Sequence, residues 1–128
     1  MNRQTPKLRQ FLPRALSRRL PRRIIVVQIS TAESSNLNHR FFKKYGSANV
    51  LSFRYGPDYG EILICPEVIR REAQEQRNTY KYQLAWMIIH GMIHLAGRHH
   101  EKSRATARKV VRLERIVLRK LSTRKLIK

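Results

Sequence analysis

Apolar residues follow two different periods along the chain, and the shorter period marks the expected strands. Residues 23–30 contain an unbroken run of isoleucine and valine, which is typical of a strand covered on both faces. Residues 49–55 and 61–65 read as two further short strands. The connection between them, residues 56–60, is rich in glycine and proline, so we expect an antiparallel hairpin.

Helical spacing of apolar residues accounts for most of the remaining chain. The expected helices cover residues 8–16, 34–42, 66–77, 80–96 and 103–121. The first lies in the basic segment 1–23, where Pro13 would kink or break it. We expect this segment to lie on the sheet with its basic residues outward, and the basic tail, residues 123–128, to fray.

Individual residues predict where these helices begin and which side they bury. Pro66 suits a first helical turn, and Thr79 and Ser103 are N-cap candidates. The positions expected to face inward are Leu37 and Phe41 in the second helix, Val68, Ile69 and Ala73 in the third, and Val110, Leu113, Val117 and Leu121 in the last. Residues 80–96 are apolar nearly all round, so that helix should be central and buried.

These elements predict one α/β (α+β) domain spanning residues 1–128. Its sheet would be small and mixed, with about three strands packed by helices. The length is enough for a real core, and 41% of the residues are hydrophobic. No apolar stretch approaches the roughly 20 residues that cross a bilayer, so we expect no membrane span.

The charge of the chain points to a polyanionic partner. Lys and Arg number 28 against 8 Asp and Glu, a formal charge of +20, which is far beyond what solubility needs. Contacts with phosphates, and the release of their counterions, would dominate such binding. The single cysteine, Cys65, cannot form an internal disulfide, which suits a reducing, cytoplasmic setting. The arginine-rich, acid-free start also resembles an organelle transit peptide, which leaves organelle targeting open.

The histidines carry the candidate chemistry. All of them except His39 lie between His90 and His100. His90 and His94 are four apart, so on a helix their rings share one face, with Cβ atoms roughly 6 Å apart. Two imidazoles so placed can bind one zinc ion.

A third ligand is expected just beyond this helix. Gly97 can take the left-handed conformation that ends a helix, after which the chain can return with His100. Spacing alone does not separate His100 from its neighbour His99. Three protein ligands would leave one zinc position open for water, as in catalytic sites, and a dense positive surface beside the metal favours hydrolysis of nucleic acid.

The chain also resembles a known family in three places. The segment His90-Gly91-Met92-Ile93-His94-Leu95-Ala96-Gly97-Arg98-His99-His100 is similar to the H-G-x-L-H-L-x-G-Y-D-H motif of the YbeY-type endoribonucleases, the rRNA maturation factors. Residues 49–53 resemble the family's T-[ND]-V-L-S-F strand, and residues 60–65 resemble its G-D-I-x-I-C strand. The resemblance covers roughly residues 24–122 and keeps the family's order and spacing.

The resemblance implies a zinc-dependent, single-strand-specific endoribonuclease that acts in rRNA maturation and ribosome assembly. It implies one zinc ion held by His90, His94 and His100, and it implies RNA and the ribosomal subunit or its proteins as partners. Neither the resemblance nor the spacing identifies a general base or nucleophile.

The family's basic segment before the V-L-S-F strand is altered in this chain. The family has Tyr-Arg-x-Lys-Asp there, with the arginine implicated in activity. Phe42 stands at the arginine, Lys44 matches the lysine and Tyr45 replaces the acid. We expect Arg40, Lys43 and Lys44 to supply the RNA-binding charge.

Three smaller departures concern the metal site and the sheet. His99 stands where the family has an aspartate, so an acidic partner for a ligand is expected to be missing. The family's opening strand has no counterpart. Glu61 stands at the aspartate of the G-D-I stretch, either as a capping or as a proton-handling group.

Two alternatives remain at this stage. The first is a non-catalytic rRNA-binding, ribosome-assembly protein with a structural zinc, which the loss of the arginine at Phe42 favours. The second is a zinc metalloprotease, which usually carries a glutamate after the first histidine. That position is Gly91 here, which cannot accept a proton, so the protease is the weaker alternative.

Overall fold

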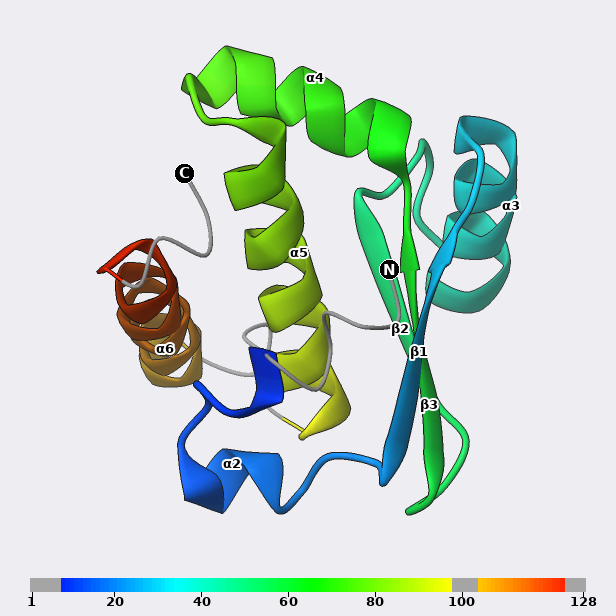
Figure 1. Cartoon of the computed structure of the whole chain (residues 1–128). Helices are drawn as coiled ribbons and strands as arrows, with labels where there is room; N and C mark the ends of the chain where they lie inside the picture. Colours follow the sequence, from blue (N-terminus) through cyan, green and yellow to red (C-terminus); the bar gives the residue numbers. More distant parts are fainter. Residues whose placement is uncertain (1–7, 98–103, 124–128) are drawn as a thin grey trace.

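The computed structural model describes residues 8–97 and 104–123 of the chain. Its elements are α2 (Arg14–Ser17), β1 (Arg23–Gln28), α3 (Thr31–Phe42), β2 (Val50–Arg54), β3 (Tyr59–Ile64), α4 (Pro66–Gln76), α5 (Tyr80–Leu95) and α6 (Arg104–Thr123). The α/β class, with a three-stranded mixed sheet packed by helices, is confirmed (Figure 1).

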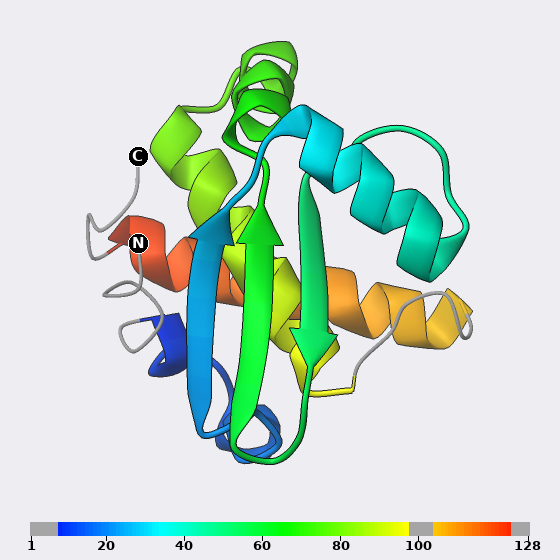
Figure 2. The same cartoon turned by 90° about the vertical axis from the view of Figure 1, so that its right-hand side faces the viewer.

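The sheet has the strand order β1-β3-β2. β3 pairs with β1 in parallel and with β2 in antiparallel, so the predicted hairpin is confirmed. The parallel pair requires the chain to cross over between β1 and β3, and α3 and β2 lie on that path (Figure 2). Because β2 is last in the strand order, it is an edge strand, and the cavity described below lies along it.

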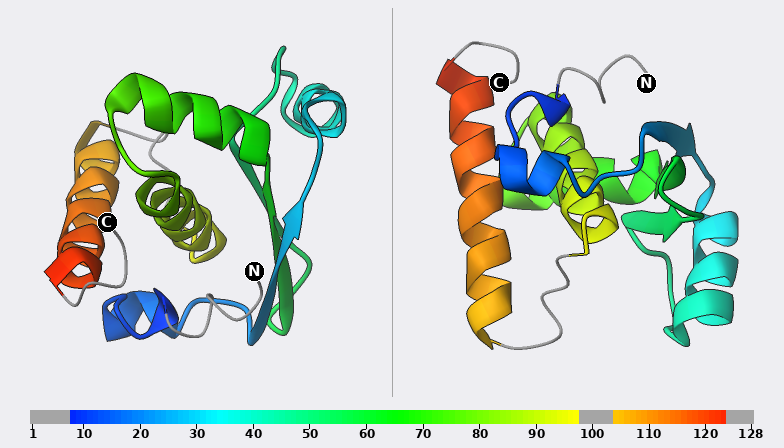
Figure 3. Two further views of the ribbon diagram at one scale, coloured as in Figure 1. Left: turned by 45° about the horizontal axis from the view of Figure 1, so that its top comes forward. Right: turned by 90° about the horizontal axis from the view of Figure 1, so that it is seen from below.

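The molecule is layered around α5, which lies against one face of the sheet, with α6 beyond it and α3 on the other side of the sheet (Figure 1). α4 and α2 close the two ends of α5 (Figure 3). Ile88, Ile89, Met92 and Ile93 of α5 have no exposed surface. The predicted central, buried helix is confirmed, and each such side chain adds about 1.5–3 kcal/mol of burial free energy.

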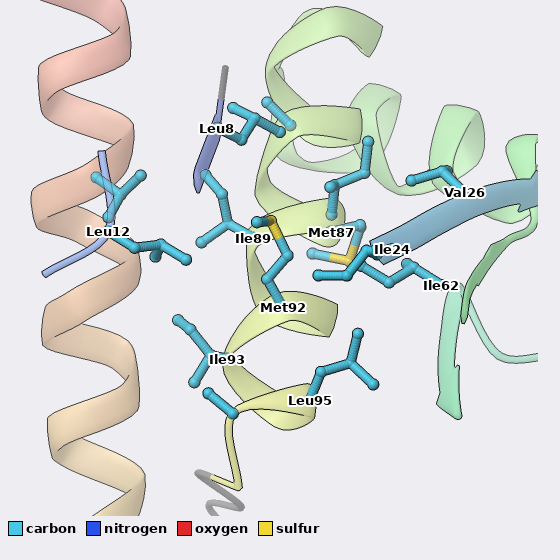
Figure 4. Packing of buried hydrophobic residues seen from close by; sticks show 14 of the residues in the cluster. Leu8, Leu12, Ile24, Val26, Ile62, Met87, Ile89, Met92, Ile93 and Leu95 are labelled. Atoms are coloured by element: carbon cyan, nitrogen blue, oxygen red, sulfur yellow. The ribbon is translucent and has the colours of Figure 1, made fainter. Parts of the chain in front are cut away.

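The core continues from the sheet through α5 to α6 and the N-terminal segment (Figure 4). Its labelled members include Ile24, Val26 and Ile62 from the sheet, Met87, Ile89, Met92, Ile93 and Leu95 from α5, and Leu8 and Leu12 from the N-terminal segment.

Among the described residues, no helix is both long and apolar enough to cross a membrane.

Helix ends follow the local signals in the sequence. Pro66 opens α4, Thr79 caps α5 by accepting a hydrogen bond from the backbone of Tyr82 at 3.1 Å, and α4 buries Val68, Ile69 and Ala73. The predicted stripe of α6 is also present, with Val110, Val117 and Leu121 buried and Leu113 partly so. Ser103, the proposed cap of α6, lies outside the described residues, as do 124–128 of the tail.

Two predictions about the sheet and the N-terminal segment are wrong. Burial alternates along β1, with Ile24 and Val26 inside and Ile25 and Val27 partly exposed, so the strand is fully covered on one face only. Pro13 does break the N-terminal segment, and it precedes the short α2. Leu8 and Leu12, however, lie beside α5 and α6 instead of on the sheet (Figure 4), where they are buried in one apolar cluster with residues of both helices.

The predicted buried face of α3 is also wrong. Phe41 is 55% exposed and Leu37 only partly buried, whereas Ser34 and Asn38 are buried. The Ser34 hydroxyl donates to the carbonyl of Ala48 at 2.7 Å and accepts from its N–H at 2.8 Å, and Asn38 Nδ2 donates to Gly46 at 3.1 Å. Because the partner of this face is loop backbone, its inward residues are polar and its aromatic residues stay outside.

Candidate metal centre and its cavity

A cavity of about 550 Å³ opens along the edge strand β2, between the end of α3 and the C-terminal half of α5. Its volume is in the range of ordinary ligand sites. Residues from all three elements line it, among them Asn38, Phe42, Lys44, Arg54, His90 and His94. Two cations therefore lie in its wall, and none of the described lining residues is acidic, which suits an anionic ligand.

His90 and His94 lie together in this wall, as their spacing predicts. Their ring centroids are 4.4 Å apart with the planes inclined by 42°. Both side chains come from the buried helix α5, so the core holds their backbone rigidly. Neighbouring imidazoles are the nitrogen donors that zinc prefers, and in this respect the described residues fit the metal.

A glutamate from α6 completes the surroundings of His90. Glu114 is 5% exposed, and one of its carboxylate oxygens lies 2.5 Å from Nδ1 of His90. The other oxygen accepts a hydrogen bond from Nε1 of Trp86 at 2.9 Å. A carboxylate only accepts hydrogen bonds, so it favours the tautomer of His90 with its proton on Nδ1, which leaves Nε2 as the possible metal-binding atom.

Glu114 was not among the residues predicted from the sequence. Because His99 replaces the family's aspartate, we expected an acidic partner for a ligand to be missing, yet an acid 24 residues from His90 on another helix contacts that histidine. A signal was present, because Glu114 interrupts the inward stripe of α6 between Val110 and Val117. An acid at a buried helical position usually has a specific partner.

The predicted third ligand lies outside the described residues. His100 and its rival His99 both fall outside the described residues. Gly97 does have the expected left-handed conformation at the end of α5, with φ of +87°. Within residues 8–97 and 104–123 no group of three His, Cys, Asp or Glu side chains gathers in a way that could hold a metal. The full ligand set therefore remains a prediction.

Of the three expected RNA-binding residues, one lines the cavity. Lys44 lies in its wall, as does Phe42. Arg40 lies over the ring of Phe41, 5.6 Å from its centroid, and Lys43 ends α3 in a left-handed conformation. Their role in binding RNA stays a prediction.

Arg54, which was not among the candidates, also lines the cavity. Its Nη1 donates to the carbonyls of Arg19 at 2.5 Å and Leu95 at 2.6 Å, and its Nε donates to Gly56 at 3.2 Å. These bonds tie the C-terminal end of α5 to the hairpin. Arg54 thus adds positive charge to the cavity, while three of its five N–H donors bond to backbone carbonyls.

Glu61 has a local partner set in the hairpin. Its carboxylate accepts hydrogen bonds from the hydroxyls of Tyr55 at 2.8 Å and Tyr59 at 3.0 Å. The neighbouring residues Gly60 and Ile62 are buried, whereas Glu61 is partly exposed and does not line the cavity. Its position fits a structural role in the hairpin better than proton transfer at the histidines.

Comparison with known proteins gives consistent matches. The family model described as Endoribonuclease YbeY matches residues 3–122. An Endoribonuclease YbeY of Polynucleobacter asymbioticus is 39% identical over 97 residues, which cover 73% of this chain and 62% of that protein. An Endoribonuclease YbeY of Bdellovibrio bacteriovorus is 32% identical over 109 residues, which cover 80% of this chain and 73% of that protein.

A solved structure agrees with the fold. The solution structure of TM1509 from Thermotoga maritima superposes with a TM-score of 0.58 at 25% identity, and covers 93% of this chain and 84% of that one. This chain spans only 62% of the length of the Polynucleobacter relative.

Proposed function

The chain belongs to the YbeY endoribonuclease family, and on that premise we propose that it is a zinc-dependent endoribonuclease of single-stranded RNA. We place its action in rRNA maturation and ribosome assembly, with rRNA and the ribosomal subunit or its proteins as partners. The buried, unpaired thiol of Cys65 suits the reducing cytoplasm as its compartment.

The observation that carries the proposal is the pair His90 and His94 in a cationic cavity. These two side chains would hold the metal, and His100 would supply the third ligand. A bound zinc ion would lower the pKa of a coordinated water toward about 7 and stabilise negative charge on the phosphate. Glu114 would fix the ring of His90 and keep its proton on Nδ1.

The remaining cavity residues would position the RNA. Lys44 is exposed and lines the cavity, so its ammonium group can approach a backbone phosphate. Arg54 would act mainly through its charge, because three of the five N–H donors of its guanidinium bond to backbone carbonyls. Both cations would raise the local concentration of the polyanion.

The packing of α5 argues against the zinc metalloprotease, which needs a glutamate after the first histidine. A Cβ atom added at Gly91 would lie 2.9 Å from Oγ of Ser52 and 3.0 Å from Cγ2 of Ile62. The residue after His90 therefore packs against the sheet, and a glutamate there would have no room to approach a metal-bound water.

The second candidate is a non-catalytic RNA-binding protein with a structural zinc. Phe42, which stands at the arginine of the resembling motif, lines the cavity next to the histidines. This wall therefore offers an apolar ring in place of one cation. The two candidates differ in cleavage and agree in metal content and RNA binding.

A chelation experiment tests the proposal. Purified protein is incubated with single-stranded RNA as isolated, after removal of metal by a chelator, and after zinc is restored. We expect cleavage that chelation abolishes and zinc restores. Cleavage that is indifferent to chelation would contradict the metal mechanism, and zinc-loaded protein that binds RNA without cutting it would favour the second candidate.

The ligand set has its own test. Zinc content is measured in His100→Ala and in its neighbour His99→Ala. Loss of the ion in the first variant and retention in the second would assign the third ligand to His100, and the opposite pattern would assign it to His99.

A further inference from the structure

Large apolar side chains gather on the surface at the rim of the cavity. At the end of α3, Phe41 is 55% exposed and Phe42 is 43% exposed. Such surface is normally buried, and neighbouring exposed rings usually mark a binding site. Figure 2 shows α3 crossing the sheet toward the edge strand β2, which brings this aromatic pair to the strand that borders the cavity.

Both rings are held by a third aromatic side chain. Phe53 of β2 lies 5.3 Å from Phe41, edge to face, and 5.8 Å from Phe42 between ring centroids. Ser34 and Asn38 fix α3 to the loop that follows it, so the backbone behind the rings is anchored as well. The two phenylalanines are therefore presented on a fixed support and would lose little freedom on binding.

Phe42 connects this aromatic surface to the metal-binding histidines. It lines the same cavity as His90, His94 and Lys44. A ligand whose phosphate lies at the histidines therefore has an aromatic ring and an ammonium group within the same pocket.

The charges around the rings indicate the kind of partner. Arg40, Lys43 and Lys44 are exposed, and in the described part of the chain no carboxylate forms an ion pair with any of them. A second copy of this chain, itself at +20, would bring no matching set of negative charges. Aromatic rings interleaved with such cations fit a polyanion that carries flat apolar groups, and this describes single-stranded nucleic acid.

We propose that Phe42, supported by Phe53 and Phe41, is a stacking site for one unpaired nucleobase of the RNA, next to the phosphodiester at the metal-binding histidines. The inference rests on the proposed function for the identity of the ligand as RNA. A base in a duplex is stacked on its neighbours and cannot occupy this site, so the site selects single strands. It reads the presence of a base and not its hydrogen-bonding edge.

Binding is measured under chelation, so that the result does not depend on cleavage. The probes are a short single-stranded RNA and copies that lack one base at each position in turn. For the wild-type chain, one abasic position should weaken binding about 5- to 150-fold, as expected for a single base–aromatic stack of ~1–3 kcal/mol. In Phe42→Ala, intact RNA should bind more weakly by a similar factor, and that abasic position should no longer matter.

Two kinds of variant serve as controls. Phe42→Trp keeps an aromatic face and should retain both the affinity and the abasic penalty, whereas Phe42→Leu keeps the apolar bulk and should lose them. Tyr45→Ala removes a ring that is 89% exposed just after the end of α3 and does not line the cavity. This variant should bind RNA like the wild type.

The proposal is overturned if Phe42→Leu binds intact RNA as tightly as the wild type, or if the abasic penalty persists in Phe42→Ala. These outcomes are separate from the proposed function, which fails if the zinc-loaded wild type does not cleave RNA. A chain that stacks a base without cutting would leave the stacking site in place and remove the nuclease.

Discussion

One carboxylate oxygen of Glu114 on α6 lies 2.5 Å from Nδ1 of His90 on α5, and the other accepts the indole N–H of Trp86 at 2.9 Å. Both partners need an acceptor, and a carboxylate supplies two. This arrangement makes Nε2 of His90 its candidate metal-binding atom. The orientation of the candidate metal ligand therefore depends on a residue from a different helix.

Glu114→Gln should weaken zinc binding about 10- to 100-fold, the usual cost of losing such a partner. The amide has one acceptor oxygen for two donors. If the oxygen serves Trp86, the NH₂ group faces Nδ1 of His90 and favours the tautomer with its proton on Nε2, which cannot bind metal. Calorimetric titration of the metal-free protein with zinc measures the effect.

A second substitution separates this effect from general damage. Trp86→Phe removes the competing donor, so in the double variant the oxygen of the introduced amide can turn to His90. We expect the double variant to regain part of the zinc affinity that the single Glu114→Gln variant loses. Equal affinity of wild type and Glu114→Gln would contradict the positioning role.

Lys44→Gln should weaken RNA binding and make it less sensitive to salt. If Lys44 contacts one phosphate, its removal lowers the slope of log affinity against log salt by about 0.7. Lys81→Gln, an exposed lysine at the other end of α5, is the matched control and should leave the slope unchanged. A slope that is flat in the wild type would argue against phosphate contacts altogether.

Gly91→Val should destabilise the protein by about 1–3 kcal/mol, the usual range for overpacking a core. Even one added carbon would press on Ser52 and Ile62, and Ser52 also donates a hydrogen bond to the carbonyl of Gly91 at 3.1 Å. Denaturant unfolding measures the change. The control variant Lys81→Val, at an exposed position of the same helix, should cost less than about 0.5 kcal/mol. Valine favours a helix more than glycine does, so helix propensity cannot account for a loss at Gly91. A loss at Gly91 no greater than that at Lys81 would contradict the close contact with the sheet.

Glu61→Gln should lower the pKa of Tyr55 toward its ordinary value of about 10. The hydrogen bond to Glu61, then burial, then the charge of Glu61 raise the pKa of Tyr55. Burial, followed by its own hydrogen bond to Glu61, raises the pKa of Tyr59. Because the pKa values of Tyr55 and Tyr59 are raised in the folded state, these interactions stabilise the fold below about pH 10. That stabilisation is lost as the pH rises through the folded pKa values. Absorbance titration of the phenols, with exposed Glu67→Gln as the control, should reveal the shift, and superimposable curves would contradict it.

Local signals made the helices and the sheet predictable. The apolar run before His90 and the cap at Thr79 predict α5 within one residue of its observed end, because both act over a few neighbouring positions. The inner face of α3 was not predictable in this way. Its partners are the loop backbone groups of Gly46 and Ala48, and nothing in helical spacing reveals such a partner.

In the candidate site, too, the features set by one helix could be predicted from the sequence and those set by tertiary packing could not. The spacing of His90 and His94 is a property of one helix and is visible directly in the sequence. Glu114 contacts His90 only because α6 packs on α5, and Phe42 reaches the cavity only because α3 ends beside β2. Such contacts depend on tertiary packing, so no local pattern contains them.

The zinc content of the purified protein tests the central claim most directly, with His94→Ala compared against His39→Ala. His39 is exposed and does not line the cavity, so it is the matched control. We predict one equivalent of zinc in the wild type and in His39→Ala, and its loss in His94→Ala. A wild type that binds no zinc, or a His94→Ala variant that keeps its full equivalent, would contradict the metal centre and the nuclease built on it.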